Sequence, residues 1–136
     1  MNEFCAIMGL CNLKHAGEAQ KSRKYVYERY TERISKIEGI KVFEGDSQAT
    51  KNYSYYPILV TEKYKLTRDE LYDKLKKENI YSRKYFYPVT SDQACFKNKY
   101  RDIEITNARH LSEQVLTLPF YEGLSNENVD RILNLL

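Results

Sequence analysis

The 136-residue sequence has no tryptophan and few of the residues that most often carry metal or redox chemistry. Its three cysteines, Cys5, Cys11 and Cys95, are odd in number and show no C-x-x-C spacing, so they predict no disulfide framework, zinc knuckle or redox pair. The apolar neighbours of Cys5 and Cys11 predict instead that these two side chains are small buried hydrophobes. The two histidines, His15 and His110, form no H-x-x-x-H or H-E-x-x-H motif, and the sequence therefore predicts no metal site.

Long apolar runs and a strong charge of one sign are also missing. No apolar stretch approaches the roughly 20 residues that span a bilayer, and the stretch after Met1 lacks the basic region of a signal peptide. The net charge is +3, with acids and bases interspersed, which is not the footprint of a nucleic-acid-binding protein. We therefore expect a cytoplasmic protein that has neither a membrane nor a nucleic acid as partner.

The motifs of a self-contained enzyme are missing as well. The five glycines are isolated, so none of them builds a phosphate-binding loop. No serine lies in a nucleophile elbow, and the sequence places no two carboxylates in one cleft. From its residues alone, the chain is expected to have no catalytic and no cofactor-binding residue of its own.

Two helices are expected at the amino terminus. The first, Phe4–Leu13, is apolar almost all round and therefore needs cover on several sides. The second, Glu18–Glu38, has apolar residues at helical spacing and ends before Gly39. An apolar patch as large as Phe4–Leu13 is rare on a soluble surface. We expect a second copy of the chain to cover it, in a homo-oligomer, or the helix to fold onto the domain's own open face.

Short strands and further helices follow. Strands are expected at Ile40–Phe43 and Tyr53–Val60, and Pro57 argues that the second one lies at a sheet edge or carries a bulge. Thr67 and Glu70 form a capping box, which opens a helix. The later elements are a helix end at Asn79, a charged loop over residues 98–105, a helical segment marked by Ala108, Leu111 and Val115, a strand at Leu116–Pro119, and a last helix capped by Ser125.

The most distinctive stretch is a tyrosine-rich strand expected from Tyr81 to Tyr87. Alternation places Tyr81, Arg83, Tyr85 and Tyr87 on one face, and Pro88 ends the strand. One interpretation is a half-buried strand whose phenols reach water, and the other is a binding surface. Together the elements predict an α+β fold, a two-layer domain with a small, mainly antiparallel sheet covered by helices.

Five blocks of the sequence resemble the patterns of one enzyme family. Residues 1–13 resemble R-M-(N/S)-E-x-Q-A-A-x-G-x-x-Q-L, and residues 53–60 resemble H-(S/A)-(Y/W)-x-x-(Y/F)-x-(I/V). Residues 69–80 resemble R-D-E-L-x-x-x-L-x-x-x-x-I, residues 86–88 resemble Y-Y-P, and residues 116–125 resemble L-S-L-P-x-Y-P-x-L-(S/T). These patterns are those of DegT/StrS-type sugar-nucleotide aminotransferases, which use pyridoxal phosphate. The blocks are collinear and cover essentially the whole chain, which is thus similar to the carboxy-terminal small domain of a fold-type I aminotransferase.

The resemblance implies that the cofactor site lies in another domain. In the family, a larger amino-terminal domain supplies the Schiff-base lysine, the ring-stacking aromatic, the acid at the ring nitrogen and the phosphate cup. The resemblance therefore implies that residues 1–38 are linking helices that join this large domain, that residues 39–136 are the small domain, and that the large domain lies outside this chain. A truncated aminotransferase part of this kind would be inactive alone and would hold no cofactor.

The chain departs from the family at one informative position. After Y-Y-P the family pattern continues P-L-H, and here Ser91 stands where the histidine is usual. Since this loop approaches the sugar nucleotide in the family, the resemblance implies a substrate-binding set of Arg83, Tyr85, Tyr87 and Ser91. The guanidinium would bind phosphate or base oxygens, and the phenols would bind hydroxyls.

Two other hypotheses remain open at this point. The chain could be half of a split aminotransferase, completed by a separate chain that carries the cofactor domain. It could also be an unrelated α+β binding module, for example a single-stranded nucleic-acid binder that stacks bases on Tyr81, Tyr85 and Phe86. The interspersed charge and the lack of an RNP-like motif count against the second hypothesis.

Overall fold

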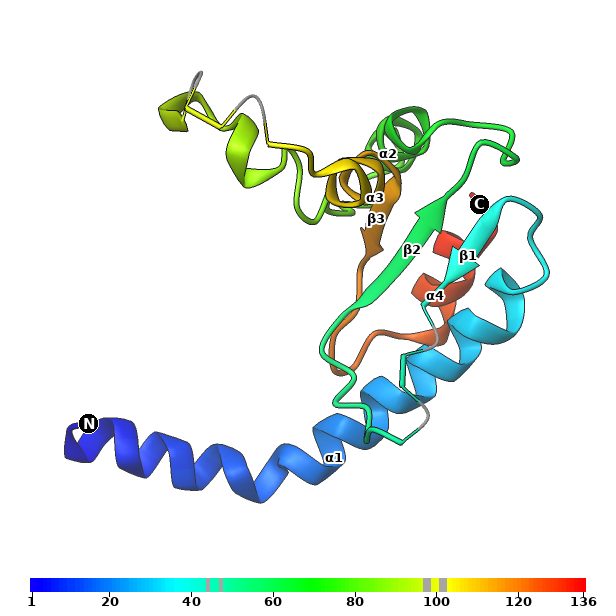
Figure 1. Ribbon diagram of the computed structural model, residues 1–136. Coiled ribbons are helices and arrows are strands. Elements are labelled where there is room, and N and C mark those ends of the chain that lie inside the picture. Colours follow the sequence, from blue (N-terminus) through cyan, green and yellow to red (C-terminus); the bar gives the residue numbers. More distant parts are fainter. Residues whose placement is uncertain (44, 47, 97–98, 101–102) are drawn as a thin grey trace.

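The computed structural model describes residues 1–43, 45–46, 48–96, 99–100 and 103–136. Its elements are α1 (Glu3–Ile34), β1 (Ile40–Val42), β2 (Tyr56–Val60), α2 (Arg68–Lys77), two 3-10 turns, η1 (Thr90–Asp92) and η2 (Ala94–Phe96), α3 (Thr106–Gln114), β3 (Val115–Leu118) and α4 (Asn126–Leu133). The three strands form one antiparallel sheet in the order β1-β2-β3 (Figure 1). The predicted α+β fold with a small antiparallel sheet is confirmed.

One hydrophobic core lies between the sheet and the helices that cover it. Val26, Tyr30 and Ile34 are the buried face of α1, and they pack in the same cluster as Tyr56 and Ile58 of β2. Leucine and isoleucine side chains of α2 and α4 complete the cluster. Figure 1 shows α4 beside the carboxy-terminal half of α1, and the two helices are in contact. A sheet residue of β2 or β3 therefore has a fixed position relative to α1.

The local signals at the two ends of α2 are where the sequence predicts them. The Thr67 side chain accepts a hydrogen bond from the Glu70 backbone, and the Glu70 side chain accepts one from the Thr67 backbone, which confirms the capping box. Asn79 directly follows Glu78, the C-cap of α2, and its φ of 58° is the left-handed conformation expected where a helix ends. Gly39 is also left-handed, with a φ of 83°, but α1 already ends at Ile34 and is capped by Ser35. The prediction that Gly39 directly follows a helix end is therefore wrong, and this glycine lies in the turn before β1.

The amino-terminal region differs from the prediction. One continuous helix of 32 residues replaces the two expected helices, because the glycine between them, Gly17, keeps helical geometry. The first half of α1 projects away from the sheet (Figure 1), so Phe4–Leu13 does not fold onto the domain's open face. Cys5 and Cys11 are exposed, and the prediction that they are buried is wrong because this part of the helix touches no core. We call residues 3–17 the arm.

The tyrosine-rich stretch is not a regular strand. Arg83 alone pairs with β3, through the backbone of Thr117. After Arg83 the chain leaves the sheet edge, because two side chains contact α2 instead. Lys84 Nζ lies 2.6 Å from Asp69 Oδ1, and the guanidinium carbon of Arg68 lies 4.7 Å from the centroid of the Tyr87 ring. The predicted strand from Tyr81 to Tyr87 is therefore wrong, and the third strand of the sheet is β3.

The second strand is shorter and more central than predicted. The strand does not begin at Tyr53, whose φ of 50° lies outside the β region, and pairing begins at Tyr56, opposite Leu118 of β3. The expectation that Pro57 marks an edge strand is wrong, since β2 lies between β1 and β3. Pro57 is tolerated there because the pairs with β1 begin only at Ile58, so Pro57 is paired on one side alone, with Thr117.

Within the part of the chain that the structure describes, no helix combines the length and the apolar character needed to cross a membrane. The loop expected over residues 98–105 lies partly outside the described residues.

Candidate functional site

A groove of about 400 Å³ lies at the end of the sheet where β2 begins and β3 ends. We call it the tyrosine groove. Its lining residues are Ser54, Tyr55, Tyr81, Arg83, Tyr85, Thr117, Leu118, Pro119, Phe120 and Tyr121. The residues come from three separate stretches of the chain, and they bring four phenols and a guanidinium into one hollow.

The sheet and the core hold the walls of this groove in place. Arg83 and Thr117 exchange two backbone hydrogen bonds, of 2.9 and 2.8 Å. The rings of Tyr55 and Tyr85 are stacked, with centroids 5.9 Å apart and planes 12° from parallel. The buried Tyr30 hydroxyl donates to the Pro119 carbonyl at 3.0 Å, which anchors the chain that leaves β3. The groove is therefore a preformed surface.

The groove is suited to a ligand that has hydroxyl groups and negative charge. A guanidinium offers five N–H donors in a planar fork that matches phosphate or carboxylate oxygens. Phenol hydroxyls both donate and accept hydrogen bonds, and aromatic faces accept stacked rings. Tyr81 and Tyr121 expose 67% and 52% of their surface, so both remain available to such a ligand.

Ser91 lies in a different, larger hollow of about 580 Å³. This hollow lies between α3 and the stretch from Tyr85 to Ser91, and Tyr85 lines both hollows. Its walls are mostly apolar, and they include Phe43, Phe86, Val89, Ile105, Ala108, Leu111 and Val115. The Ser91 hydroxyl is 3.4 Å from the Asp92 carboxylate, which forms an ion pair with Arg109. The Arg109 hydrogen bond lowers the pKa of Asp92, so this carboxylate stays charged beside Ser91.

Tyr87 lies apart from the other three predicted site residues. Its ring packs against the buried Arg68 guanidinium, and the Lys84 ammonium lies 5.9 Å from the ring centroid. Arg68 donates to the carbonyls of Ser112 and Val115. The Lys84 hydrogen bond lowers the pKa of Asp69, whose carboxylate binds both cations. This cluster attaches the stretch around Tyr87 to α2 and β3.

The structure thus brings Arg83 and Tyr85 together, places Ser91 in the neighbouring hollow, and places Tyr87 against α2. Sequence reasoning did not single out Tyr55 and Tyr121 as site residues. The only signal for them was the high tyrosine content, thirteen residues of 136, because their approach to Tyr85 depends on pairing between distant strands.

The described residues do not fit pyridoxal phosphate. A Schiff-base lysine needs a desolvated pocket, and every described lysine is exposed or half-buried. The two half-buried ones are engaged elsewhere: Lys74 donates to the Leu135 carbonyl at 2.5 Å, and Lys84 binds Asp69. Among the residues that the structure describes, no group of three or more histidine, cysteine, aspartate or glutamate side chains could hold a metal ion.

Comparison with known proteins identifies relatives over the whole chain. A model of the DegT/DnrJ/EryC1/StrS aminotransferase family matches residues 1–136. The dTDP-4-amino-4,6-dideoxy-D-glucose transaminase of Escherichia coli is 36% identical over 140 residues, which cover 100% of this chain and 37% of that protein. The protein of the same name from Shigella dysenteriae is 35% identical, over 98% of this chain and 36% of its own. The chain spans about a third of the length of these curated relatives.

Solved structures have the same fold over nearly the whole chain. DesI, determined in the presence of its TDP-sugar product, superposes with a TM-score of 0.88 over 99% of this chain and 34% of its own, at 24% identity. PseC from Helicobacter pylori, an aminotransferase involved in the biosynthesis of pseudoaminic acid, has a TM-score of 0.85 over 99% of this chain and 36% of its own, at 18% identity. At these identities the likeness concerns the fold alone.

Proposed function

The chain belongs to the DegT/DnrJ/EryC1/StrS aminotransferase family, and from this premise we propose that it supplies the small domain of a pyridoxal-phosphate-dependent aminotransferase of nucleotide-linked keto-sugars. The observation that carries the proposal is the combination of a family match over residues 1–136 with a lysine set that does not fit the cofactor. Residues outside these 136 then hold the cofactor, and the chain alone is inactive. Membership of the family also argues against an unrelated nucleic-acid-binding module.

The arm is the part that joins the missing portion of the enzyme. In this proposal residues 1–38 link to the large domain, and residues 39–136 form the small domain. The support is the exposure of apolar side chains on the arm: Phe4, Ile7, Met8, Leu10 and Leu13 each expose between 58% and 80% of their surface. Burial of such side chains against a second surface is favourable, by about 25 cal/mol per Å² of apolar area.

The tyrosine groove is one wall of the sugar-nucleotide site. Arg83 and Tyr85 contact the ligand in this account, and Ser91 reaches it from the neighbouring hollow. Tyr87 was predicted as a fourth contact. Because its ring packs against Arg68, we assign Tyr87 a positioning role instead, in which it holds the stretch between Tyr85 and Ser91 in place. Without the opposite wall most of the ligand would stay in water, so the isolated chain binds it weakly.

A split enzyme is the second candidate. In this version a separately encoded chain carries the cofactor domain and binds the arm. The exposed apolar arm favours this candidate as much as the first, and the two differ in whether the chain associates with a cofactor domain that is not covalently attached to it.

One experiment tests the proposal and separates its two versions. The chain is assayed with pyridoxal phosphate, 2-oxoglutarate and dTDP-4-amino-4,6-dideoxy-D-glucose, the amino sugar in the name of the Escherichia coli relative, with formation of glutamate as the readout. The chain alone is expected to give no turnover. Addition of the part of that relative outside the matched region should restore activity only if the two pieces assemble in trans. Turnover by the chain alone, at a rate proportional to its concentration, would contradict the proposal.

A further inference from the structure

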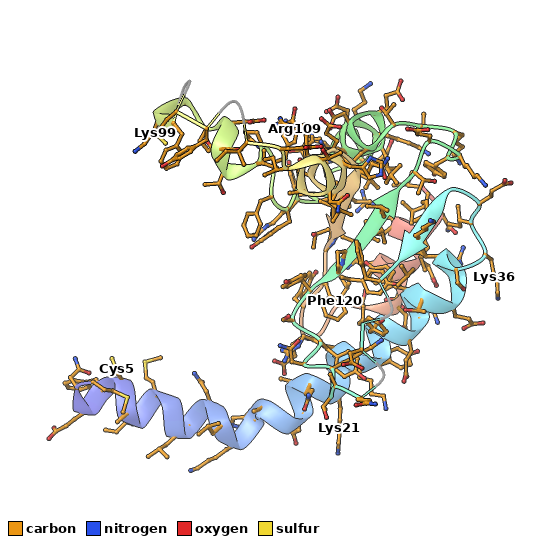
Figure 2. All side chains as sticks on the ribbon, in the orientation of Figure 1. Cys5, Lys21, Lys36, Lys99, Arg109 and Phe120 are labelled. Atoms are coloured by element: carbon orange, nitrogen blue, oxygen red, sulfur yellow. The ribbon has the colours of Figure 1, made fainter. Side chains whose placement is uncertain are left out.

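A second hollow adjoins the tyrosine groove. It has a volume of about 510 Å³ and is lined by Arg23, Asn52, Ser54, Phe120, Tyr121 and Glu122. Ser54, Phe120 and Tyr121 line both hollows, so the two form one trough with Arg83 in one part and Arg23 in the other. Figure 2 shows Phe120, a residue of this common wall, near the point where α1 meets the sheet.

Arg23 differs from the other arginines of α1. Arg29 and Arg33 both form ion pairs with Asp130 of α4. Arg23 is half-buried, and its covered Nε has no hydrogen-bond partner among the described residues. Glu122 lies on the same hollow and yet forms no ion pair with it within the described part of the chain. A covered donor without an acceptor destabilises a fold. A contribution to folding stability therefore does not account for an arginine at position 23.

A second unsatisfied group lines the same trough. Among the described residues, three buried side-chain polar atoms have no hydrogen-bond partner, namely Arg23 Nε, Ser82 Oγ and Thr117 Oγ1. Thr117 lines the tyrosine groove and Arg23 lines the adjoining hollow. Two of these three atoms therefore belong to residues that line the trough, beside the exposed rings of Tyr81 and Tyr121.

We propose that Arg23 is a ligand-binding residue, which together with Arg83 binds the diphosphate of a nucleoside diphosphate group. This inference rests on the proposed function and extends it to a residue on α1. Two guanidiniums along one trough suit a ligand with two linked phosphates, because each planar fork binds phosphate oxygens through paired N–H donors. The phenol rings of Tyr81 and Tyr121 offer faces on which a base stacks. The Glu122 carboxylate lines the same hollow and repels the same anion.

The arginine side chains themselves provide the readout. The 136-residue chain, labelled with ¹⁵N, is titrated at low salt with dTDP, with inorganic pyrophosphate and with thymidine, and the Nε–Hε resonances are followed by NMR. The Arg23 and Arg83 signals are expected to shift with dTDP and with pyrophosphate, and to stay in place with thymidine. Arg23→Gln and Arg83→Gln should each weaken dTDP binding at least tenfold. Lys24→Gln is the matched control, because it removes one positive charge at the residue next to Arg23. Lys24 is solvent-exposed and pairs with Glu28, so this variant should change dTDP binding less than twofold.

A thermal melt distinguishes a binding role from a structural one. Arg23→Met should unfold at the same temperature as the wild type or higher, because it removes a covered donor that has no partner. A melting temperature lowered by several degrees, or dTDP affinity unchanged in Arg23→Gln, would overturn the inference. If dTDP binds and only Arg83→Gln weakens this binding, the inference about Arg23 fails, while the proposal that the tyrosine groove is one wall of the sugar-nucleotide site is retained. If dTDP does not bind at 10 mM, the inference fails, and the proposed function is then judged by the turnover assay alone.

Discussion

At the residue scale, Gly39 connects the end of the α1 region to β1 in a place where no side chain fits. Its φ is 83°, and a Cβ atom would lie 2.2 Å from the Tyr64 backbone nitrogen. Gly39→Ala is therefore expected to cost about 3 kcal/mol of unfolding free energy, from left-handed strain of ~1 kcal/mol and steric overlap of ~2 kcal/mol. Urea denaturation measures the loss.

Gly123 is the matched control for this prediction. Its φ is 77°, and nothing lies within 4 Å of the position that a Cβ atom would occupy. Gly123→Ala should cost only the strain, about 1 kcal/mol. Equal losses in the two variants would show that the close approach of Tyr64 to Gly39 has no energetic effect.

Tyr56 is one of three core tyrosines through which alkaline pH acts on stability, since burial also raises the pKa of Tyr30 and of Tyr64. Burial raises the pKa of the Tyr56 phenol to about 12, above the ordinary value of about 10. Folding favours the neutral phenol, so its contribution is complete below pH 10 and is lost between pH 10 and pH 12. Over this range the buried phenol should lower stability by about 1.4 kcal/mol per pH unit.

Tyr56→Phe isolates this effect. At pH 7 the variant should lose about 1 kcal/mol, since the hydrogen bond between Tyr56 and the Thr31 hydroxyl disappears. Above pH 10 its stability should fall less steeply than that of the wild type, in urea titrations at half-unit intervals. Parallel curves above pH 10 would refute the assignment of this pH dependence to Tyr56.

At the element scale, α1 has two halves that contribute differently to stability. Val26, Tyr30 and Ile34 belong to the core, while no residue up to Gly17 is in the core cluster of the described chain, and nothing lies within 4 Å of a Cβ atom placed at Gly9 or Gly17. Gly17→Pro breaks the helix at the arm and should change the free energy of unfolding of the domain by less than about 0.5 kcal/mol. Glu28→Pro, at an exposed position in the packed half, should cost about 3 kcal/mol or more. A similar loss in both variants would mean that the arm unfolds together with the domain.

Elements whose signals are local could be predicted from the sequence. The capping box at Thr67 needs only residues three apart, and the left-handed end of α2 at Asn79 needs only one residue type at one position. The helices that follow Thr67 and Ser125 were predicted for the same reason.

Elements that depend on distant contacts could not be predicted in this way. Alternation in residues 81–87 is the pattern of a strand, but pairing stops after Arg83 because Lys84 and Tyr87 bind α2 instead. The tyrosine groove was anticipated at Arg83 and Tyr85, but the stacking of Tyr55 on Tyr85 joins residues 30 positions apart. Exposure of the arm cysteines depends on the path of the whole helix, which composition does not specify.

At the scale of the whole molecule, the arm leaves a large apolar surface uncovered. Phe4, Met8 and their apolar neighbours are exposed in the single chain, and such surfaces associate in water. We expect the chain to self-associate through the arm at micromolar concentration, and a double Phe4→Glu, Met8→Glu variant to be monomeric. Light scattering coupled to gel filtration measures both masses. A wild-type chain that elutes as a monomer with a helical arm would contradict this expectation.

The central claim is that this chain belongs to a sugar aminotransferase family yet does not itself hold the cofactor. The most direct test is titration of the chain with pyridoxal phosphate, followed by absorbance at the aldimine band, borohydride reduction and mass analysis of the peptides. We predict no saturable aldimine band and only scattered, substoichiometric labelling of exposed lysines, because no described lysine lies in a desolvated pocket. One stoichiometric adduct on a single lysine, together with turnover of an amino donor, would contradict the account.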